Sequence, residues 1–98
     1  MGEVRLGGYL VCASQDEARI VTEHLPEHVA LTRGEPGCLA FDVTPTDDPL
    51  AWRVDERFHD EAAFAAHQAR AAESNWGRAT AGIERRYSVE VLPDTEAR

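Results

Sequence analysis

Three side chains that can exchange a proton or bind an anion interrupt otherwise apolar patterns in this sequence. Glu56 and Arg85 each occupy an apolar position in a segment of alternating residues, and His67 lies three residues after Phe64. Residues three apart share one face of a helix, so the imidazole is expected on an apolar helical face. An imidazole tuned by a nearby carboxylate can take a proton from a weakly acidic substrate near neutral pH. His67 and Glu56 are therefore the first candidates for catalysis.

Burying a lone charge is so unfavourable that Glu56 and Arg85 each need a partner or a wet cavity. One interpretation is a structural Glu56–Arg85 ion pair at the end of a sheet. The other is that both residues line a ligand pocket together with His67. His67 itself has two interpretations, a satisfied core histidine or a catalytic base.

Other residues are candidates for binding a flat substrate. Tyr9, Trp76 and Tyr87 offer aromatic surfaces and hydroxyl donors, although each also suits an ordinary core. Phe64 shares the helical face of His67 and is the fourth apolar candidate. Asn75 beside Trp76 is unusual at a helix end, but a capping role explains it equally well.

The remaining histidines and the cysteines predict neither a metal site nor a redox motif. His24, His28 and His59 do not converge with carboxylates at ligand spacing. Cys12 and Cys38 lack the spacing of a Cys-x-x-Cys motif and are expected to be small buried hydrophobic residues.

The elements that must position these residues follow from the apolar periods. Runs rich in β-formers predict strands at 4–12, 38–44, 51–59 and 83–92. A first helix begins after Ser14, with Glu17 completing a capping box, and ends at the turn residues 32–37. A second helix covers about 61–73 after Asp60 as N-cap, and 74–78 is a short irregular or one-turn segment.

The first predicted helix has one apolar stripe and one interruption. The stripe consists of Ala18, Val21, Leu25 and Val29. Pro26 falls inside it, and we expect a kink there or a division into two segments, because proline removes a helical donor.

The resulting order β-α-β-β-α-β predicts an α+β fold of the ferredoxin-like kind, with both helices on the apolar face of a four-stranded antiparallel sheet. Leu39, Phe41 and Val43 are expected to share that face. The opposite face carries charged residues that are either solvated or paired across a dimer. Its predicted members are Asp42, Arg53, Asp55, Arg57, Glu84, Arg86 and Glu90.

Length and composition limit the possibilities. The 98 residues form one domain, with a core at about 4–92 and a polar tail at 93–98. The formal net charge of −8 disfavours binding to nucleic acid or anionic membranes. No apolar run is long enough to span a membrane and no signal peptide is recognisable, so we expect a cytoplasmic protein.

Two motifs resemble the antibiotic biosynthesis monooxygenase (ABM) domain family. They are Glu35-Pro36-Gly37-Cys38 and Glu56-x-Phe58-x-Asp60-x-x-Ala63-Phe64-x-x-His67, and the similarity extends from about residue 4 to 92. The resemblance implies a dimeric α+β barrel, that is, a homodimer built by sheet-to-sheet packing. It also implies a monooxygenase that oxidises phenols, quinols or anthrones with O2 and uses no metal, flavin or haem.

In such a reaction the resemblance assigns His67 as base or orienting donor, Glu56 as its orienter and Arg85 as anion stabiliser. Haem degradation is disfavoured, because the asparagine, tryptophan and histidine typical of that branch are missing. Two alternatives stay open on this scaffold. One is an isomerase of a small metabolite, and the other is a non-catalytic, dimeric binding or stress-associated module.

Overall fold

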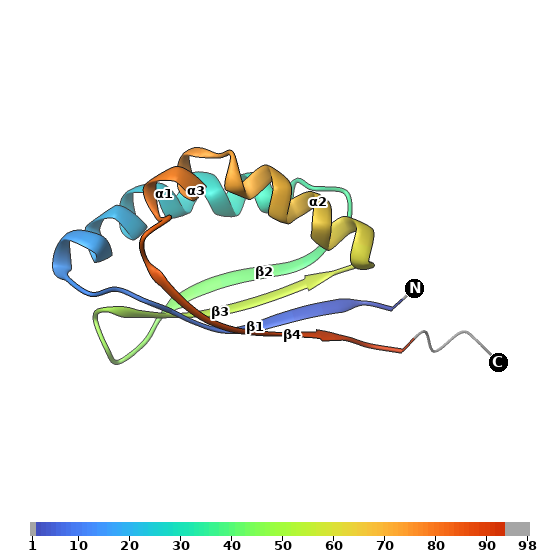
Figure 1. The fold of residues 1–98 in the computed structure, drawn as a ribbon, viewed down its shortest axis with the longest axis horizontal. Helices are drawn as coiled ribbons and strands as arrows, with labels where there is room; N and C mark the ends of the chain where they lie inside the picture. Colours follow the sequence, from blue (N-terminus) through green and yellow to red (C-terminus); the bar gives the residue numbers. More distant parts are fainter. Residues whose placement is uncertain (1, 94–98) are drawn as a thin grey trace.

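The computed structural model describes residues 2–93, in which one antiparallel sheet carries three helices on a single face (Figure 1). The strands are β1 (Val4–Val11), β2 (Cys38–Pro45), β3 (Ala51–Phe58) and β4 (Glu84–Val91). Their order across the sheet is β2-β3-β1-β4. The helices are α1 (Gln15–Arg33), α2 (Glu61–Ala72) and α3 (Asn75–Ala79). The predicted ferredoxin-like fold is confirmed.

Each helix begins at a side chain that accepts a hydrogen bond from a backbone N–H of the first turn. Ser14 accepts from the amide of Glu17, Asp60 from that of Ala63 at 2.8 Å, and Ser74 from that of Gly77. These caps supply acceptors for N–H groups that have no partner inside the helix. They also fix where α2 begins, and therefore where its inward-facing residues lie.

Of the two alternatives expected at Pro26, a kink or a division of the first helix, the division is wrong. α1 is one helix of 19 residues that includes Pro26. Pro26 and Thr22, whose carbonyl loses its donor, are both exposed, so the missing bond lies on the solvent side. After the proline the buried positions are His28 and Thr32, and Val29 is only partly buried.

The apolar core lies between the sheet and the helices. Val4, Leu6 and Leu10 of β1 pair with positions of β3 and β4 on the same face. The buried apolar residues are Val4, Leu6, Leu10, Cys12, Val21, Phe41, Trp52, Val54, Phe58, Trp76 and Ile83. The predicted face of β2 needs one correction. A register shift between Cys38 and Ala40 leaves Leu39 half exposed, because a bulge interrupts the alternation of side chains.

The other face of the sheet is open and charged. Arg53 pairs with Asp55 at 2.9 Å, and Arg57 pairs with Glu3 at 2.5 Å. Tyr9 belongs to this face, where the guanidinium of Arg53 lies 5.2 Å from its ring centroid. Among residues 2–93, no helix is long and apolar enough to cross a membrane.

Candidate functional site

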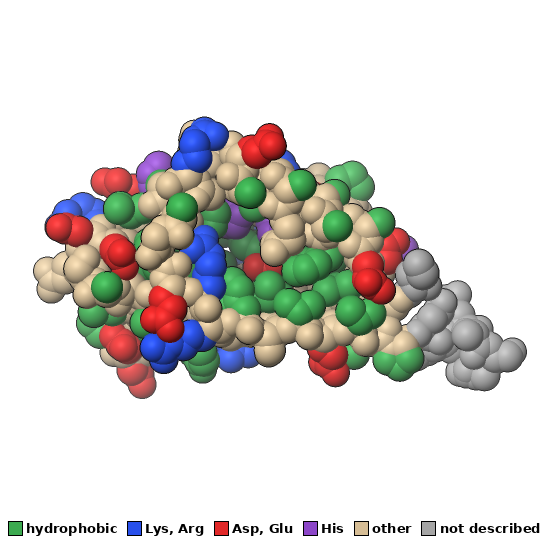
Figure 2. Space-filling view, viewed as in Figure 1, with side chains coloured by type: hydrophobic (Ala, Val, Ile, Leu, Met, Phe, Trp, Pro, Cys, Tyr) green, Lys and Arg blue, Asp and Glu red, His purple; other side chains and the backbone are tan. Residues whose placement is uncertain are grey.

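A cavity of about 360 Å³ separates the helical layer from the sheet. Figure 2 shows it as a hollow with acidic and histidine side chains inside and basic side chains at its rim. Its volume falls at the lower end of the range for small-molecule sites. The residues that line it are Leu6, His28, Phe41, Val43, Val54, Glu56, His67, Gln68, Ala71, Ala72, Trp76, Gly77, Ala81, Arg85 and Tyr87.

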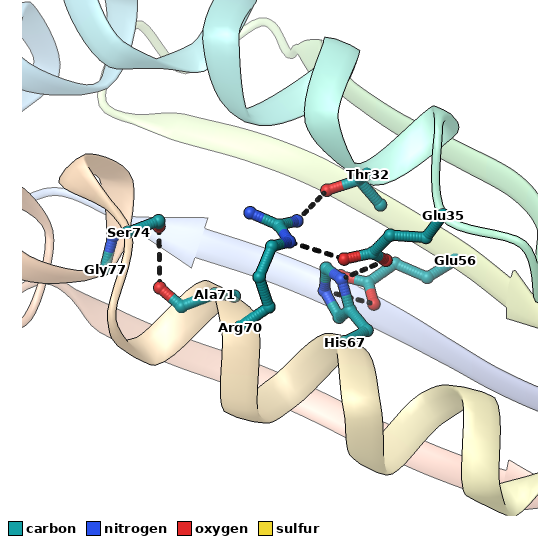
Figure 3. Close-up of polar contacts among 8 residues, drawn as sticks. All are labelled: Thr32, Glu35, Glu56, His67, Arg70, Ala71, Ser74 and Gly77. Carbon is teal, nitrogen blue, oxygen red and sulfur yellow. Dashed lines mark hydrogen bonds and ion pairs between the residues drawn. The ribbon is translucent and has the colours of Figure 1, made fainter.

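The His67 ring lies between two carboxylates at one wall of this cavity (Figure 3). Its Nδ1 is 2.9 Å from Oε1 of Glu35, and its Nε2 is 3.9 Å from Oε1 of Glu56. Glu35 comes from the turn after α1, Glu56 from β3 and His67 from α2. The three side chains therefore meet only when the helical layer is packed on the sheet.

The contact with Glu35 fixes which imidazole nitrogen carries the proton. A carboxylate accepts hydrogen bonds, so Nδ1 of His67 donates to Glu35. Arg70 donates to the other oxygen of Glu35 at 2.5 Å and to Oγ1 of Thr32 at 3.0 Å. In the neutral ring Nε2 is then left as the acceptor, directed toward Glu56.

Burial pushes both His67 and Glu56 toward their uncharged forms. Burial lowers the pKa of His67, and the nearby Glu35 carboxylate opposes that shift. Burial, helped by the charge of Glu35, raises the pKa of Glu56 from 4.5 to about 7. Oε1 of Glu56 is buried and has no hydrogen-bond partner among residues 2–93. A neutral imidazole with a free Nε2 next to a carboxyl group that titrates near neutral pH can accept and return a proton.

Two aromatic rings form a flat part of the wall. The imidazole of His28 is stacked on Trp76, with ring centroids 4.7 Å apart and planes 4° apart. Phe41 meets His28 edge to face at 5.2 Å. Burial lowers the pKa of His28 to about 3, so this ring is neutral at physiological pH.

Arg85 and Tyr87 line the cavity from β4. The expectation that Arg85 is a buried charge is wrong, because Arg85 is exposed at the rim of the cavity, whereas Tyr87 is partly buried. Nη1 of Arg85 donates to the carbonyl oxygens of Thr80 and Ile83, at 2.7 and 2.9 Å, and Nη2 donates to Oγ1 of Thr80 at 2.8 Å. Burial raises the pKa of Tyr87 to about 12, so its hydroxyl group keeps its proton.

The structure brings together five of the eight residues singled out in the sequence. His67, Glu56, Arg85, Trp76 and Tyr87 all line the cavity. The suggested Glu56–Arg85 ion pair is wrong, because within residues 2–93 the ionic neighbour of Glu56 is His67 and the three bonds of Arg85 go to neutral oxygens.

The other three residues do not line the cavity. Tyr9 lies on the opposite face of the sheet, as strand alternation from the buried Leu10 requires. Phe64 packs against Phe58 with ring centroids 5.6 Å apart. Asn75 is exposed and donates to Glu27 at 3.2 Å.

Sequence reasoning missed two contributors, Glu35 and His28. Glu35 was noticed only as part of the Glu-Pro-Gly motif, and nothing local relates it to His67, 32 residues later. His28 entered the sequence analysis only as one of three histidines without metal-ligand spacing. Its spacing of three from Leu25 and seven from Val21 places it on the apolar stripe, which is the pattern that identifies it.

Within residues 2–93, no three His, Cys, Asp or Glu side chains gather in a way that could hold a metal ion.

The sequence was compared with models of known protein families. The sequence profile of the antibiotic biosynthesis monooxygenase family matches residues 11–78, which include both carboxylates and the histidine. The chain belongs to this family. No functionally curated protein matches the sequence.

Solved structures similar to this ABM protein share its fold at low sequence identity. The Rv0793 protein of Mycobacterium tuberculosis is 17% identical, with a TM-score of 0.73 over 97% of this chain and 99% of the other. A Nitrosomonas europaea protein that carries the family's name is 20% identical, with a TM-score of 0.73 over 95% and 98% of the two chains. PA3566 of Pseudomonas aeruginosa is 22% identical, with a TM-score of 0.68 over 94% and 93%.

Proposed function

We propose that this protein is a cofactor-independent monooxygenase that oxidises a phenolic, quinol-type or anthrone-like aromatic molecule with O2. One observation carries the proposal. His67 is oriented by Glu35 through Nδ1, and its Nε2 lies beside the carboxyl group of Glu56, whose pKa is about 7. Membership of the ABM family supports the reaction class.

The proposed reaction begins with proton transfer. An acidic O–H or C–H group of the substrate gives its proton to Nε2 of His67, and Glu35 stabilises the imidazolium that forms. The substrate anion passes one electron to O2, and the organic radical and superoxide then combine to form a C–O bond.

The imidazolium returns its proton to the peroxide. For an anthrone-type CH2 group, the O–O bond then breaks with loss of a second C–H proton, giving a carbonyl group and one molecule of water. One oxygen atom of O2 enters the product and the other leaves as water. The chain supplies binding, exclusion of water and the base.

The test is O2 uptake with a panel of anthrones and hydroquinones, comparing the unmodified protein with His67→Ala. We expect removal of the imidazole to slow uptake by about 100-fold or more, the usual contribution of a positioned acid–base group. His59→Ala is the matched control, because the side chain of His59 is 74% exposed and lies outside the cavity. The proposal would be refuted if the unmodified protein consumed no O2 with any panel member, or if His67→Ala consumed O2 as fast as the unmodified protein.

Anaerobic measurements separate the alternative reactions. An isomerase would use the same base without O2, so substrate turnover that persists under strict anaerobiosis would replace the monooxygenase by an isomerase. The non-catalytic alternative expects Glu56, His67 and Arg85 to satisfy one another. A cavity between them and an unpartnered Oε1 on Glu56 favour a ligand site instead.

We also propose that two copies pack through their open sheet faces. Tyr9 is 43% exposed on this face, and its arginines are already held in ion pairs by carboxylates of the same chain. Sedimentation analysis is expected to give the mass of a dimer, and a monomer at micromolar concentration would refute this arrangement.

A further inference from the structure

Arg85 is an exposed cation at the rim of the cavity, and within residues 2–93 no carboxylate balances its positive charge. Its three hydrogen bonds go to the carbonyl oxygens of Thr80 and Ile83 and to the hydroxyl group of Thr80, all of them neutral. Most other arginines in residues 2–93 pair with a carboxylate. Those that do are Arg5, Arg19, Arg33, Arg53, Arg57, Arg70 and Arg86.

The free donors of Arg85 form a fork. A guanidinium has five N–H groups, two on each terminal nitrogen and one on Nε. Both N–H groups of Nη1 and one of Nη2 are used on Thr80 and Ile83. Arg85 also shares a side-chain hydrogen bond with Tyr87, whose hydroxyl group is neutral. The remaining donors, on Nε and Nη2, meet no carboxylate within residues 2–93, and they lie on the edge that binds a carboxylate through two parallel hydrogen bonds.

In the part of the chain that the structure describes, no other fixed positive charge lines the cavity. The two histidines on its wall are kept neutral by burial, and the carboxyl group of Glu56 is buried. Arg85 is therefore the fixed positive charge on this wall, and a carboxylate group of a ligand could pair with it.

Arg85 and Glu56 stand at opposite ends of the cavity. Arg85 pairs with Leu10 of β1, whereas Glu56 pairs with Leu6 of the same strand. Four residues along a strand and two strand spacings separate their Cα atoms by roughly 16 Å. The guanidinium of Arg85 is moreover held back at Thr80 and Ile83, which precede β4 and lie on the side away from Glu56, so one oxygen of a ligand does not reach both.

We infer that the ligand of this cavity is a phenolic aromatic acid, with its hydroxyl group at His67 and Glu56 and its carboxylate on the free fork of Arg85. The inference rests on the proposed function, because it takes the His67 end as the reacting end. The stacked rings of His28 and Trp76 and apolar side chains of the sheet line the same cavity. The volume of about 360 Å³ is more than twice that of a cavity of about 150 Å³ that holds benzene, which suits two fused rings.

The test measures binding without turnover. Isothermal titration compares 6-hydroxy-2-naphthoate with its methyl ester, which keeps the rings and the hydroxyl group but has no charge. We expect the acid to bind about 10-fold or more tightly than the ester to the unmodified protein, as a charge-assisted pair predicts. Arg85→Gln should remove this difference, and Arg85→Lys should keep a reduced preference for the acid.

Arg78→Gln is the matched control, because Arg78 also lacks an ion pair but binds Asn75 and Glu73 outside the cavity. It should retain the full preference for the acid. Equal affinities for acid and ester, or a preference unchanged in Arg85→Gln, would overturn the inference.

Sedimentation of Arg85→Gln provides a second criterion. A change in assembly would assign the guanidinium to an interface and would also overturn the inference. A negative result for the carboxylate site can be told apart from a negative result for the proposed oxidation. Neutral hydroquinones can still be oxidised if the acid is not preferred, and the acid can be preferred in a protein that takes up no O2.

Discussion

Replacing Glu56 by glutamine should stabilise this protein at alkaline pH and have little effect at acid pH. Glu56 is 7% exposed, and its Oε1 has no hydrogen-bond partner. Its pKa rises from 4.5 to about 7 on folding, mainly because burial disfavours the charged form. The folded protein therefore holds this proton more tightly than the unfolded chain does.

The direction and size of the effect follow from that difference. Below pH 4.5 the carboxyl group is protonated in both states and costs nothing. As the pH rises from 4.5 to 7 the unfolded chain ionises first, so the free energy of unfolding falls. One pKa unit corresponds to about 1.4 kcal/mol, so the shift from 4.5 to about 7 gives a ceiling of about 3 kcal/mol above pH 7.

Urea denaturation at pH 4.5 and pH 8 measures this directly. Glu56→Gln removes the titrating group and keeps the shape of the side chain. The free energy of unfolding of the variant, relative to that of the unmodified protein, should therefore rise by up to about 3 kcal/mol between pH 4.5 and pH 8. Glu23→Gln is the control, since Glu23 is exposed on α1. If the stability of Glu56→Gln depends on pH as steeply as that of the unmodified protein, or more steeply, the assignment of a buried, neutral carboxyl group is refuted.

Two further predictions concern the wall of the cavity. Burial lowers the pKa of His28 from 6.5 to about 3, so the free energy of unfolding should fall as the pH drops below 6.5. His28→Asn should remove up to about 5 kcal/mol of this loss, measured by urea denaturation at several pH values. His59→Asn is the control and should leave the loss unchanged. Gly77→Ala should cost about 1–3 kcal/mol in thermal or urea unfolding, because its Cβ would lie 2.1 Å from the carbonyl oxygen of Ala71. Gly82→Ala has open space around the new atom and should be nearly neutral, and equal losses for both glycines would contradict this.

The fold was predictable because its determinants are local. Alternating apolar residues define each strand, and the caps Ser14 and Asp60 fix the two main helices, which is why these elements agree with the structure to within a few residues. The errors have local physical causes as well. Leu39 sits on a bulge that shifts the alternation, and Pro26 is tolerated because the lost hydrogen bond faces solvent.

The site was only partly predictable because its contacts are long-range. Strand alternation placed Glu56 and Arg85 on the helix-covered face, but it did not fix their distance along the strands, which depends on register. The pairing of Glu35 with His67 requires a turn and a helix from distant parts of the chain to meet. The position of Tyr9, by contrast, could have been predicted from the sequence. It precedes the buried Leu10 in the same strand, so its side chain must point to the open face of the sheet.

The two carboxylates that flank His67 are unequal, and the inequality suits the proposed proton transfer. Glu35 is 2.9 Å from Nδ1 and is tied to Arg70, so it is in place to stabilise a positive ring. Glu56 is 3.9 Å from Nε2, which is too far for a hydrogen bond and leaves room for an incoming oxygen atom. In its protonated form Glu56 can donate to the anion that the substrate becomes. Charge separation would then occur where each developing charge already has a partner, at the buried end of the cavity that holds His67 and Glu56.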